Sequence, residues 1–342
     1  MLSDVAVFTV DGDEYRWRDV IIAAVRWGEW AEADRRTRQG IAAMSYSDET
    51  SAPLPASALD TAAKEFRYAR DLVTALSMEQ WLARWGITAK EWTGHLKREL
   101  HRSRWPAIAD SLIGRYEMPD EEVAPLALID AICSGALDTW AKTLASRVAA
   151  VQNIASSTSS GDPLDPPAAI QALLGDDVET VRQTSRRLQR LDEAFEQFRA
   201  TQLTEPAIQE YVATRQLDWV RFDCRSMSFA AEDMAAEAAL LLREDGEGFT
   251  GVYSVAHAVP QVLRFYVDRL TGPLRDQFLA ARTGDLVGPA LVNDEYVLYL
   301  IQDKVLPTVR DPEVRRRAEE GVLQHVLRQQ LDRRVRWHVS AP

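Results

Sequence analysis

Side chains that could carry nucleophilic or acid–base chemistry are few in this sequence, and Cys224 is the first candidate among them. The 342 residues include two cysteines and five histidines. A cysteine acts as a nucleophile once a neighbouring base, usually histidine, has removed its proton. No histidine lies close to Cys224 in the sequence, so we interpret Cys224 as a small apolar residue on a buried strand. A histidine brought near by folding stays open as the alternative.

Histidine can serve as a general base or bind a metal ion. His257 is a candidate base, although a single histidine at the end of a predicted helix more often has a structural or capping role. His95 and His101 are six residues apart in a predicted helix, which does not align them as two ligands of one metal. The sequence contains no CxxC pair, no metal-spaced Cys/His cluster and no glycine-rich phosphate-binding loop. We therefore predict no metal site and no cofactor.

The composition limits the classes of partner. Hydrophobic residues make up 46% and charged residues 27% of the chain, which is typical of a soluble globular protein with a sizeable core. The net charge of −12 argues against nucleic acid as a partner, because a phosphate backbone would be repelled. The N-terminus lacks the pattern of a signal peptide, and no apolar run has the length of a membrane span. We expect a cytoplasmic protein without a membrane partner.

Residues 1–152 are predicted to form a mainly helical N-terminal domain. A strand candidate, Val5–Val10, precedes the helices. Capping boxes, in which a Ser or Thr and a Glu or Gln three residues later bond each other's backbone amides, predict helix starts at Ser77 and Thr88. Gly86 predicts the end of the first of these two helices.

Residues 153–168 are predicted to be a linker, because this stretch is rich in serine, proline and aspartate. Residues 169–216 are then expected to contain a long helix and a connecting helix. Apolar residues recur at helical spacing from Val178 to Phe198, and Thr204–Pro206 has the pattern of a new helix start with proline in the first turn.

Residues 217–307 change to a pattern of strands and short helices, which predicts a small α+β unit with an antiparallel sheet. Residues 308–342 are expected to supply a C-terminal helix that packs its broad apolar stripe on the N-terminal domain. The predicted fold class of the whole chain is therefore α+β. Within 217–307 the expected elements are a strand over 217–229, helices over 231–244 and 249–258, a strand over 263–267, a helix over 271–282 and a last strand over 284–304.

This segment resembles the parvulin family of peptidyl-prolyl isomerases. The matching stretches are EDGEGFTGVYSVA, which closes the predicted helix over 231–244, and FLAARTGDLVGPALVNDEYVLYLIQDK, which is similar to the family's closing helix, turn and strand. The layout of the chain resembles SurA-type and PrsA-type foldases, in which an N-terminal helical segment and a C-terminal helix flank the parvulin unit. The region Cys133–Gly135 and the terminal RVRWH resemble cytoplasmic relatives associated with the maturation of peptide natural products.

The departures from the family bear on catalysis. The resemblance implies one histidine on the first strand and another on the last. This sequence has Asp223 and Cys224 near the first position and Val297 at the second. The family's Gly-Gly-x-Leu-Gly turn is also missing, since residues 258–266 read AVPQVLRFY. The resemblance therefore implies a parvulin-like unit without its usual catalytic histidines, and Asp223, Cys224 and His257 are the remaining weak candidates.

What remains at the implied site is apolar. A hydrophobic cleft beside a strand edge can hold an extended peptide without chemistry. Side chains alternate along a strand, so we expect Val297 to face this cleft and Leu298 to face the core. The predicted peptide-binding residues are Leu263, Phe265, Leu270, Leu274, Phe278, Tyr296 and Val297.

Three functions fit these observations. The leading hypothesis is a parvulin-like chaperone or maturation factor that binds a peptide or an unfolded polypeptide segment, for example a natural-product precursor. The second is an enzyme that acts on the bound peptide, either a non-canonical prolyl isomerase or a peptide-modifying catalyst. The third is a scaffold for peptide-modifying enzymes.

Overall fold

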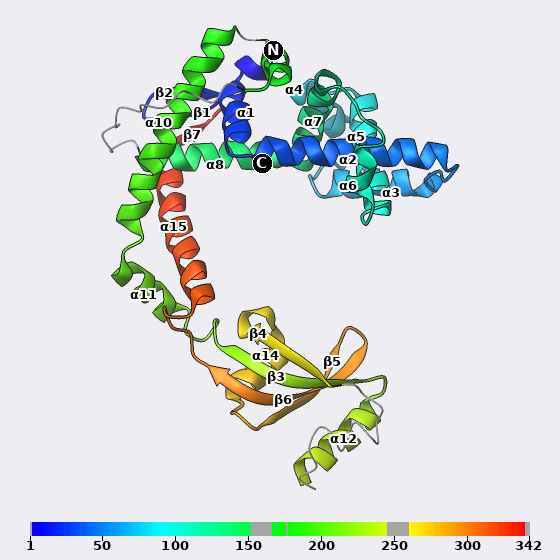
Figure 1. The fold of residues 1–342 in the computed structure, drawn as a ribbon, viewed down its shortest axis with the longest axis vertical. Helices are drawn as coiled ribbons and strands as arrows, with labels where there is room; N and C mark the ends of the chain where they lie inside the picture. Colours follow the sequence, from blue (N-terminus) through cyan, green and yellow to red (C-terminus); the bar gives the residue numbers. More distant parts are fainter. Residues whose placement is uncertain (1, 152–165, 176, 245–259, 339–342) are drawn as a thin grey trace. The chain divides into compact units, whose positions relative to one another are not determined.

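The computed structural model describes residues 2–151, 166–175, 177–244 and 260–338 (Figure 1). The chain divides into two compact units, of which the first contains Met1–Arg199 and Val326–Pro342 and the second Ala200–His325. Helices and small antiparallel sheets occur together, so the fold is α+β, as predicted.

The first unit is mainly helical. Its core cluster includes Trp17, Trp85 and Trp140, each less than a tenth exposed, so these tryptophans pack inside the unit. Phe66 stacks edge-on against Trp81 and packs beside Trp92. The helices are α1 (Trp17–Arg26), α2 (Glu29–Glu49), α3 (Ala56–Tyr68), α4 (Ala75–Trp85), α5 (Ala89–Arg104), α6 (Ala109–Ile113), α7 (Asp120–Ser134), α8 (Ala136–Val151), α9 (Ala168–Leu174) and α10 (Val178–Gln202).

No single helix in the described ranges is long and apolar enough to cross a membrane. Taken together, α7 and α8 have the length and composition of a membrane span, but they are bent by 80° at their junction.

A three-stranded sheet joins the two ends of the first unit, with strand order β2-β1-β7 (Figure 1). The predicted strand near the N-terminus is present as β1 (Ala6–Val10), and it pairs with β2 (Asp13–Arg16). The C-terminal helix predicted within 308–342 ends at Arg334, and the next residues form β7 (Val335–Trp337), which pairs with β1. Phe8 and Trp337 lie opposite each other in this register, with ring centroids 5.5 Å apart.

The capping pattern predicts one helix start correctly and misplaces the other. Thr88 accepts a hydrogen bond from the Glu91 amide at 3.2 Å, and the Glu91 carboxylate accepts one from the Thr88 amide at 2.7 Å, as predicted. The other helix begins at Ala75, and its N-cap lies three residues before the cap expected at Ser77. Thr74 is its N-cap and Ser77 is the reciprocal partner, because hydroxyls supply both capping oxygens here. Gly86 ends this helix in the left-handed region, with φ 63°.

A buried polar network joins α2, α5 and α7. The Asp130 carboxylate, 9% exposed, accepts hydrogen bonds from Arg98 Nε at 2.9 Å and from Arg98 Nη2 at 2.6 Å. Thr37 Oγ1 donates to the same carboxylate at 2.8 Å, and His95 Nδ1 lies 2.9 Å from its other oxygen. Gly40 permits the close crossing of α2 and α5, since a Cβ there would lie 2.7 Å from Arg98 Cβ. Three helices therefore converge on one carboxylate.

The second unit is built on a four-stranded antiparallel sheet with strand order β4-β3-β6-β5 (Figure 1). This order places β4 and β5 at the two edges. The predicted helix over 249–258 lies outside the described residues. The elements are α11 (Glu205–Thr214), β3 (Arg221–Phe229), α12 (Glu232–Glu244), β4 (Gln261–Tyr266), α14 (Gly272–Ala280), β5 (Leu286–Val292), β6 (Glu295–Val305) and α15 (Pro312–Arg334).

The last strand predicted over 284–304 is present as β6, but it is not single, because this stretch forms the hairpin β5–β6. Asn293 and Asp294 make the turn, with φ of 50° and 65°. Two consecutive left-handed residues give a turn whose twist matches that of the paired strands, and Asn and Asp tolerate this conformation better than most residues. The sheet consequently has one more strand than the sequence pattern suggested.

The helix α15 contributes to the cores of both units. Val314 and Ala318 pack with Ile208, Val212 and Trp219 in a cluster of the second unit. Leu331 packs against the core of the first unit. The predicted apolar stripe is therefore real, but only its last part joins the N-terminal helices.

We expect Gly321→Ala to lower the unfolding free energy of the second unit by about 1–3 kcal/mol, as over-packing typically does. A Cβ at position 321 of α15 would overlap the ring of Tyr211 on α11, which now packs 5.9 Å from Trp219 between ring centroids. Thermal melting of the full chain measures the change. Gly114→Ala is the matched control, because a Cβ at position 114 meets nothing within 4 Å. Equal melting temperatures for Gly321→Ala and the parent would contradict this prediction.

Candidate functional site

The four-stranded sheet has two apolar faces, each covered by one helix. On one face Phe222 of β3 and Tyr299 of β6 pack with Phe278 of α14. On the other face Met227 of β3 and Leu298 of β6 pack beneath α12. Val297 belongs to the first cluster and Leu298 to the second, so the predicted alternation along β6 is confirmed. We call the first face, with its half-buried border, the α14 face.

Cys224 lies in the floor of the α14 face and is fully buried. It is paired with Leu263 on β4 and with Ile301 on β6. Burial raises the pKa of its thiol to about 12, and the adjacent Asp223 carboxylate adds to the shift. The thiol is therefore protonated at neutral pH and shielded from solvent, which favours the interpretation of Cys224 as a packed core residue.

Asp223 points to the opposite side of β3 and is held by arginines. Arg264 Nε and Nη2 donate to its two oxygens at 2.8 and 3.1 Å, and Arg221 Nε lies 3.5 Å away. Asp223 is therefore engaged by arginines on the side of the sheet away from a ligand on the α14 face. His257, the remaining catalytic candidate, lies outside the described residues.

The structure separates the seven predicted peptide-binding residues by depth and by face. Phe278 is 0% and Val297 7% exposed, so both are core residues rather than the surface of a cleft. Tyr296 belongs to the cluster under α12, on the opposite face, because it is one position from Val297 along the strand. The other four are half-buried and border the α14 face: Leu263, Phe265, Leu270 and Leu274.

Aromatic rings form the floor beneath this border. The centroid of the Phe278 ring lies 5.1 Å from that of Phe222, 5.3 Å from Phe265 and 5.2 Å from Tyr299, each pair edge to face. Such pairs have a preferred geometry as well as buried area, so the floor is rigid. Burial also raises the pKa of the Tyr299 hydroxyl.

Lys304 fixes the end of α14 over this floor. Its Nζ donates to the Leu279 carbonyl at 2.6 Å and to the Ala281 carbonyl at 2.8 Å. These bonds satisfy carbonyl groups that the C-terminal turn of a helix leaves unpaired. Sequence reasoning missed this role, because a lysine near the end of a strand gives no sign of which distant helix it caps.

β4 presents an open edge beside the α14 face. It pairs with β3 on one side, and none of the described strands pairs with its other side. Leu263 and Phe265 lie opposite Cys224 and Phe222, so their side chains are on the α14 face. Val262 points the other way and is 75% exposed. The edge therefore combines unpaired backbone groups with alternating apolar side chains.

Comparison with known proteins adds little to this geometry. No family model and no curated protein matches the sequence. Among solved structures, the chain is similar to one from a study of two SurA-like chaperones of Campylobacter jejuni, the virulence factor PEB4 and the periplasmic protein Cj1289. The match has a TM-score of 0.18 and 11% sequence identity, and it covers 78% of this chain and 95% of the other. At this level of likeness it carries no argument about fold or activity.

Proposed function

We propose that the protein is a polypeptide-binding chaperone or maturation factor, and that an extended apolar segment of its client binds along β4 on the α14 face. The observation that carries this proposal is the half-buried border of Leu263, Phe265, Leu270 and Leu274 above a rigid aromatic floor. A natural-product precursor peptide is one client of this chemical class.

Strand addition explains how such a segment would be held. The unpaired N–H and C=O groups of β4 can bond the backbone of an extended peptide, which gives affinity without regard to its sequence. Every second side chain of the peptide would then lie over Leu263, Phe265 and Leu274. Burying an aliphatic or aromatic side chain in such contacts contributes about 1.5–3 kcal/mol.

We expect prolyl isomerase activity to be weak or absent. The barrier to rotation of a peptide bond is about 18–20 kcal/mol, and only groups that favour the twisted amide lower it. Cys224 is buried with a pKa raised to about 12, Asp223 is bound by two arginines, and Val297 has no polar group. A protease-coupled assay on a proline peptide tests this; turnover comparable with an ordinary parvulin would favour the alternative of an enzyme.

Leu274→Asn tests the binding surface. This variant should lower the affinity for a fluorescein-labelled peptide of alternating leucine and serine about tenfold, since about 1.4 kcal/mol of apolar contact would be lost. Fluorescence anisotropy measures the affinity, and thermal melting shows that the fold is kept. The matched control is Leu217→Asn, because Leu217 is also a leucine of the second unit but is 65% exposed and outside the α14 face.

Two results would overturn the proposal. Equal affinities for Leu274→Asn, Leu217→Asn and the parent would exclude the α14 face as the binding surface. Failure of the parent to bind any extended apolar peptide, together with co-purification of a peptide-modifying enzyme, would favour the scaffold hypothesis.

A further inference from the structure

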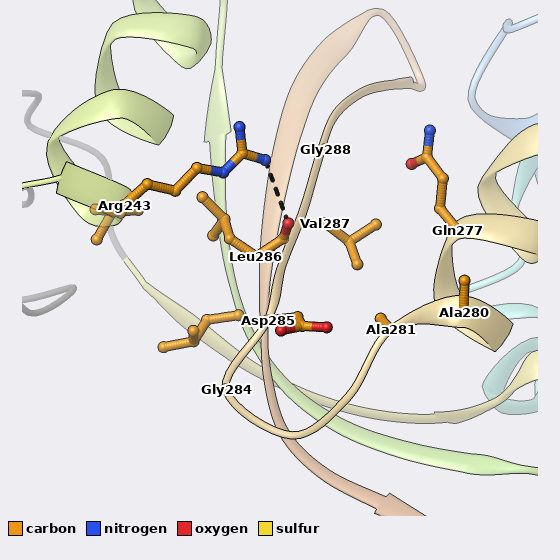
Figure 2. A pocket seen from close by; sticks show the side chains of 11 residues that line it. Arg243, Gln277, Ala280, Ala281, Gly284, Asp285, Leu286, Val287 and Gly288 are labelled. Carbon is orange, nitrogen blue, oxygen red and sulfur yellow. Dashed lines mark hydrogen bonds between the residues drawn. The ribbon is translucent and has the colours of Figure 1, made fainter.

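The opposite edge of the same sheet carries a groove of about 750 Å³ along β5 (Figure 2). The end of α12 borders it on one face of the sheet, and the end of α14 borders it on the other. We call it the β5 groove. Its lining residues are Leu242, Arg243, Gln277, Ala280, Ala281, Gly284, Asp285, Leu286, Val287, Gly288 and Leu300.

The backbone of β5 is open to this groove at Leu286. The Ile301 amide bonds the Asp285 carbonyl at 2.9 Å, so Asp285 directs its carbonyl toward β6. Backbone groups alternate in direction along an antiparallel strand, and the N–H and C=O of Leu286 therefore point away from β6. Arg243 Nη2 donates to the outward carbonyl of Leu286 at 3.4 Å (Figure 2). An exposed arginine thus makes one long hydrogen bond to the open edge of the strand.

Each flank of the groove includes apolar side chains beside polar ones. Leu242 of α12 and Leu300 of β6 belong to the cluster on the α12 side of the sheet. Val287 and Ala281 belong to the cluster on the α14 side. Successive side chains of a strand point to opposite faces, so a strand added beside β5 would meet some apolar side chains on both. This is the arrangement that strand addition requires.

The charged side chains near the groove indicate which kind of peptide segment it would bind. The arginines Arg264, Arg275 and Arg317 of the second unit are each paired with an aspartate within the described residues. Arg243 has no carboxylate within ion-pair distance in the part of the chain that the structure describes, although it borders the groove. Asp285 also lines the groove, and its carboxylate accepts a hydrogen bond from the Arg282 amide at 2.8 Å, within the turn that precedes β5. The groove is therefore complementary to a carboxylate near Arg243.

We propose that the β5 groove binds an extended segment of a partner polypeptide as an additional strand, with alternating apolar side chains and an acidic residue next to Arg243. The guanidinium leaves the Leu286 carbonyl and pairs with the carboxylate of the segment. A backbone N–H of the segment replaces it on that carbonyl. This site is separate from the half-buried border beside β4, since it lies at the other edge of the sheet, and the two can be tested independently.

The test uses the full chain and fluorescein-labelled peptides of alternating valine and threonine that carry one glutamate, glutamine or lysine at the same position. We expect the glutamate peptide to bind about fivefold more tightly than the glutamine peptide, as one exposed ion pair allows. Arg243→Glu should reverse this preference in favour of the lysine peptide. Ala280→Trp, which places a large ring in the groove from an exposed position of α14, should leave only binding along β4 and so abolish the preference among the three peptides.

A glutamate peptide with N-methyl groups at alternate backbone nitrogens serves as the control for strand addition, because it cannot donate to the Leu286 carbonyl. Equal affinity of the methylated and unmethylated peptides would overturn the proposal, as would an Arg243→Glu variant that keeps its preference for glutamate. If sedimentation shows that the parent forms a dimer and that Ala280→Trp is a monomer, the groove binds a second copy of this chain instead of a partner segment, and the proposal is overturned. Leu274→Asn should leave the preference for glutamate unchanged, so failure here and failure of the border beside β4 are distinguishable.

Discussion

Replacing Asp130 with alanine should lower the unfolding free energy of the first unit by about 3–5 kcal/mol, the usual loss when one partner of a buried ion pair is removed. Arg98 is 6% exposed, and its Nε and Nη2 both donate to this carboxylate. Without Asp130 the guanidinium charge would stay buried without this partner. Thr37 and His95, also buried, would lose the same acceptor. Urea unfolding followed by circular dichroism measures the loss.

Acid should weaken the same network. Burial alone would raise the pKa of Asp130, but hydrogen bonds from His95 and Arg98 outweigh it and hold the pKa below its ordinary value. A carboxyl with a lowered pKa in the folded state stabilises the fold above its unfolded pKa, and this contribution is lost as the pH falls through the folded pKa. The parent should thus lose stability in acid more steeply than Asp130→Asn does.

Two further variants distinguish loss of the buried ion pair from a nonspecific loss of stability. The double replacement Asp130→Leu with Arg98→Met should recover much of the stability lost in Asp130→Ala, because apolar groups of similar size remove the unpaired charge. Glu32→Ala is the control, since this exposed carboxylate bonds only the exposed Arg35 within the described residues, and little change is expected. A loss below about 1 kcal/mol for Asp130→Ala would show that solvent reaches Arg98.

Phe278→Ala should have a comparable effect on the second unit, about 3–5 kcal/mol, because a large side chain would leave a cavity in a rigid core. Phe278 is fully buried and packs edge to face against Phe222, Phe265 and Tyr299. From the sequence, Phe278 was expected to line the binding cleft. Its depth makes it a stability residue instead, so peptide binding should be lost only together with the fold.

Phe265→Ala is the matched control, because Phe265 belongs to the same aromatic group but is half-buried at its border. This variant should lose less stability than Phe278→Ala and proportionally more affinity for an apolar peptide. Hydrogen exchange of β3 and β6 amides reports the stability of the sheet, and anisotropy reports the affinity. If Phe278→Ala melts like the parent and loses only peptide binding, the residue is part of the binding surface after all.

Local patterns predicted local structure well. The α+β class, the Thr88–Glu91 capping box and the opposite faces of Val297 and Leu298 depend on neighbours within a few residues, and the structure agrees with each. The helix start expected at Ser77 was three residues late, because Thr74 supplies the cap with a serine in place of the usual acid or amide. The Asn293–Asp294 turn was not predicted, although its local pattern was present: two residues that tolerate positive φ separate two apolar runs.

Contacts between distant segments could not be predicted in this way. Asp130 meets Thr37 and Arg98 across sequence separations of 93 and 32 residues, and nothing in their local patterns links them. For the candidate site, the apolar border residues Leu263 and Leu274 follow from periodicity, but how deeply Phe278 lies does not. The β5 groove depends on which strand forms the edge of the sheet, a property of strand order rather than of sequence near Arg243.

The pairing of β1 with β7 has a consequence for folding during synthesis on the ribosome. β1 is the middle strand of its sheet, yet its partner at Val335–Trp337 is translated only after the whole of Ala200–His325. Until then one edge of β1, with Phe8 beside it, stays unpaired and open to other nascent strands. All residues of the second unit are therefore synthesised before the first unit is complete, and the sheet of the first unit can close only after the second has been made.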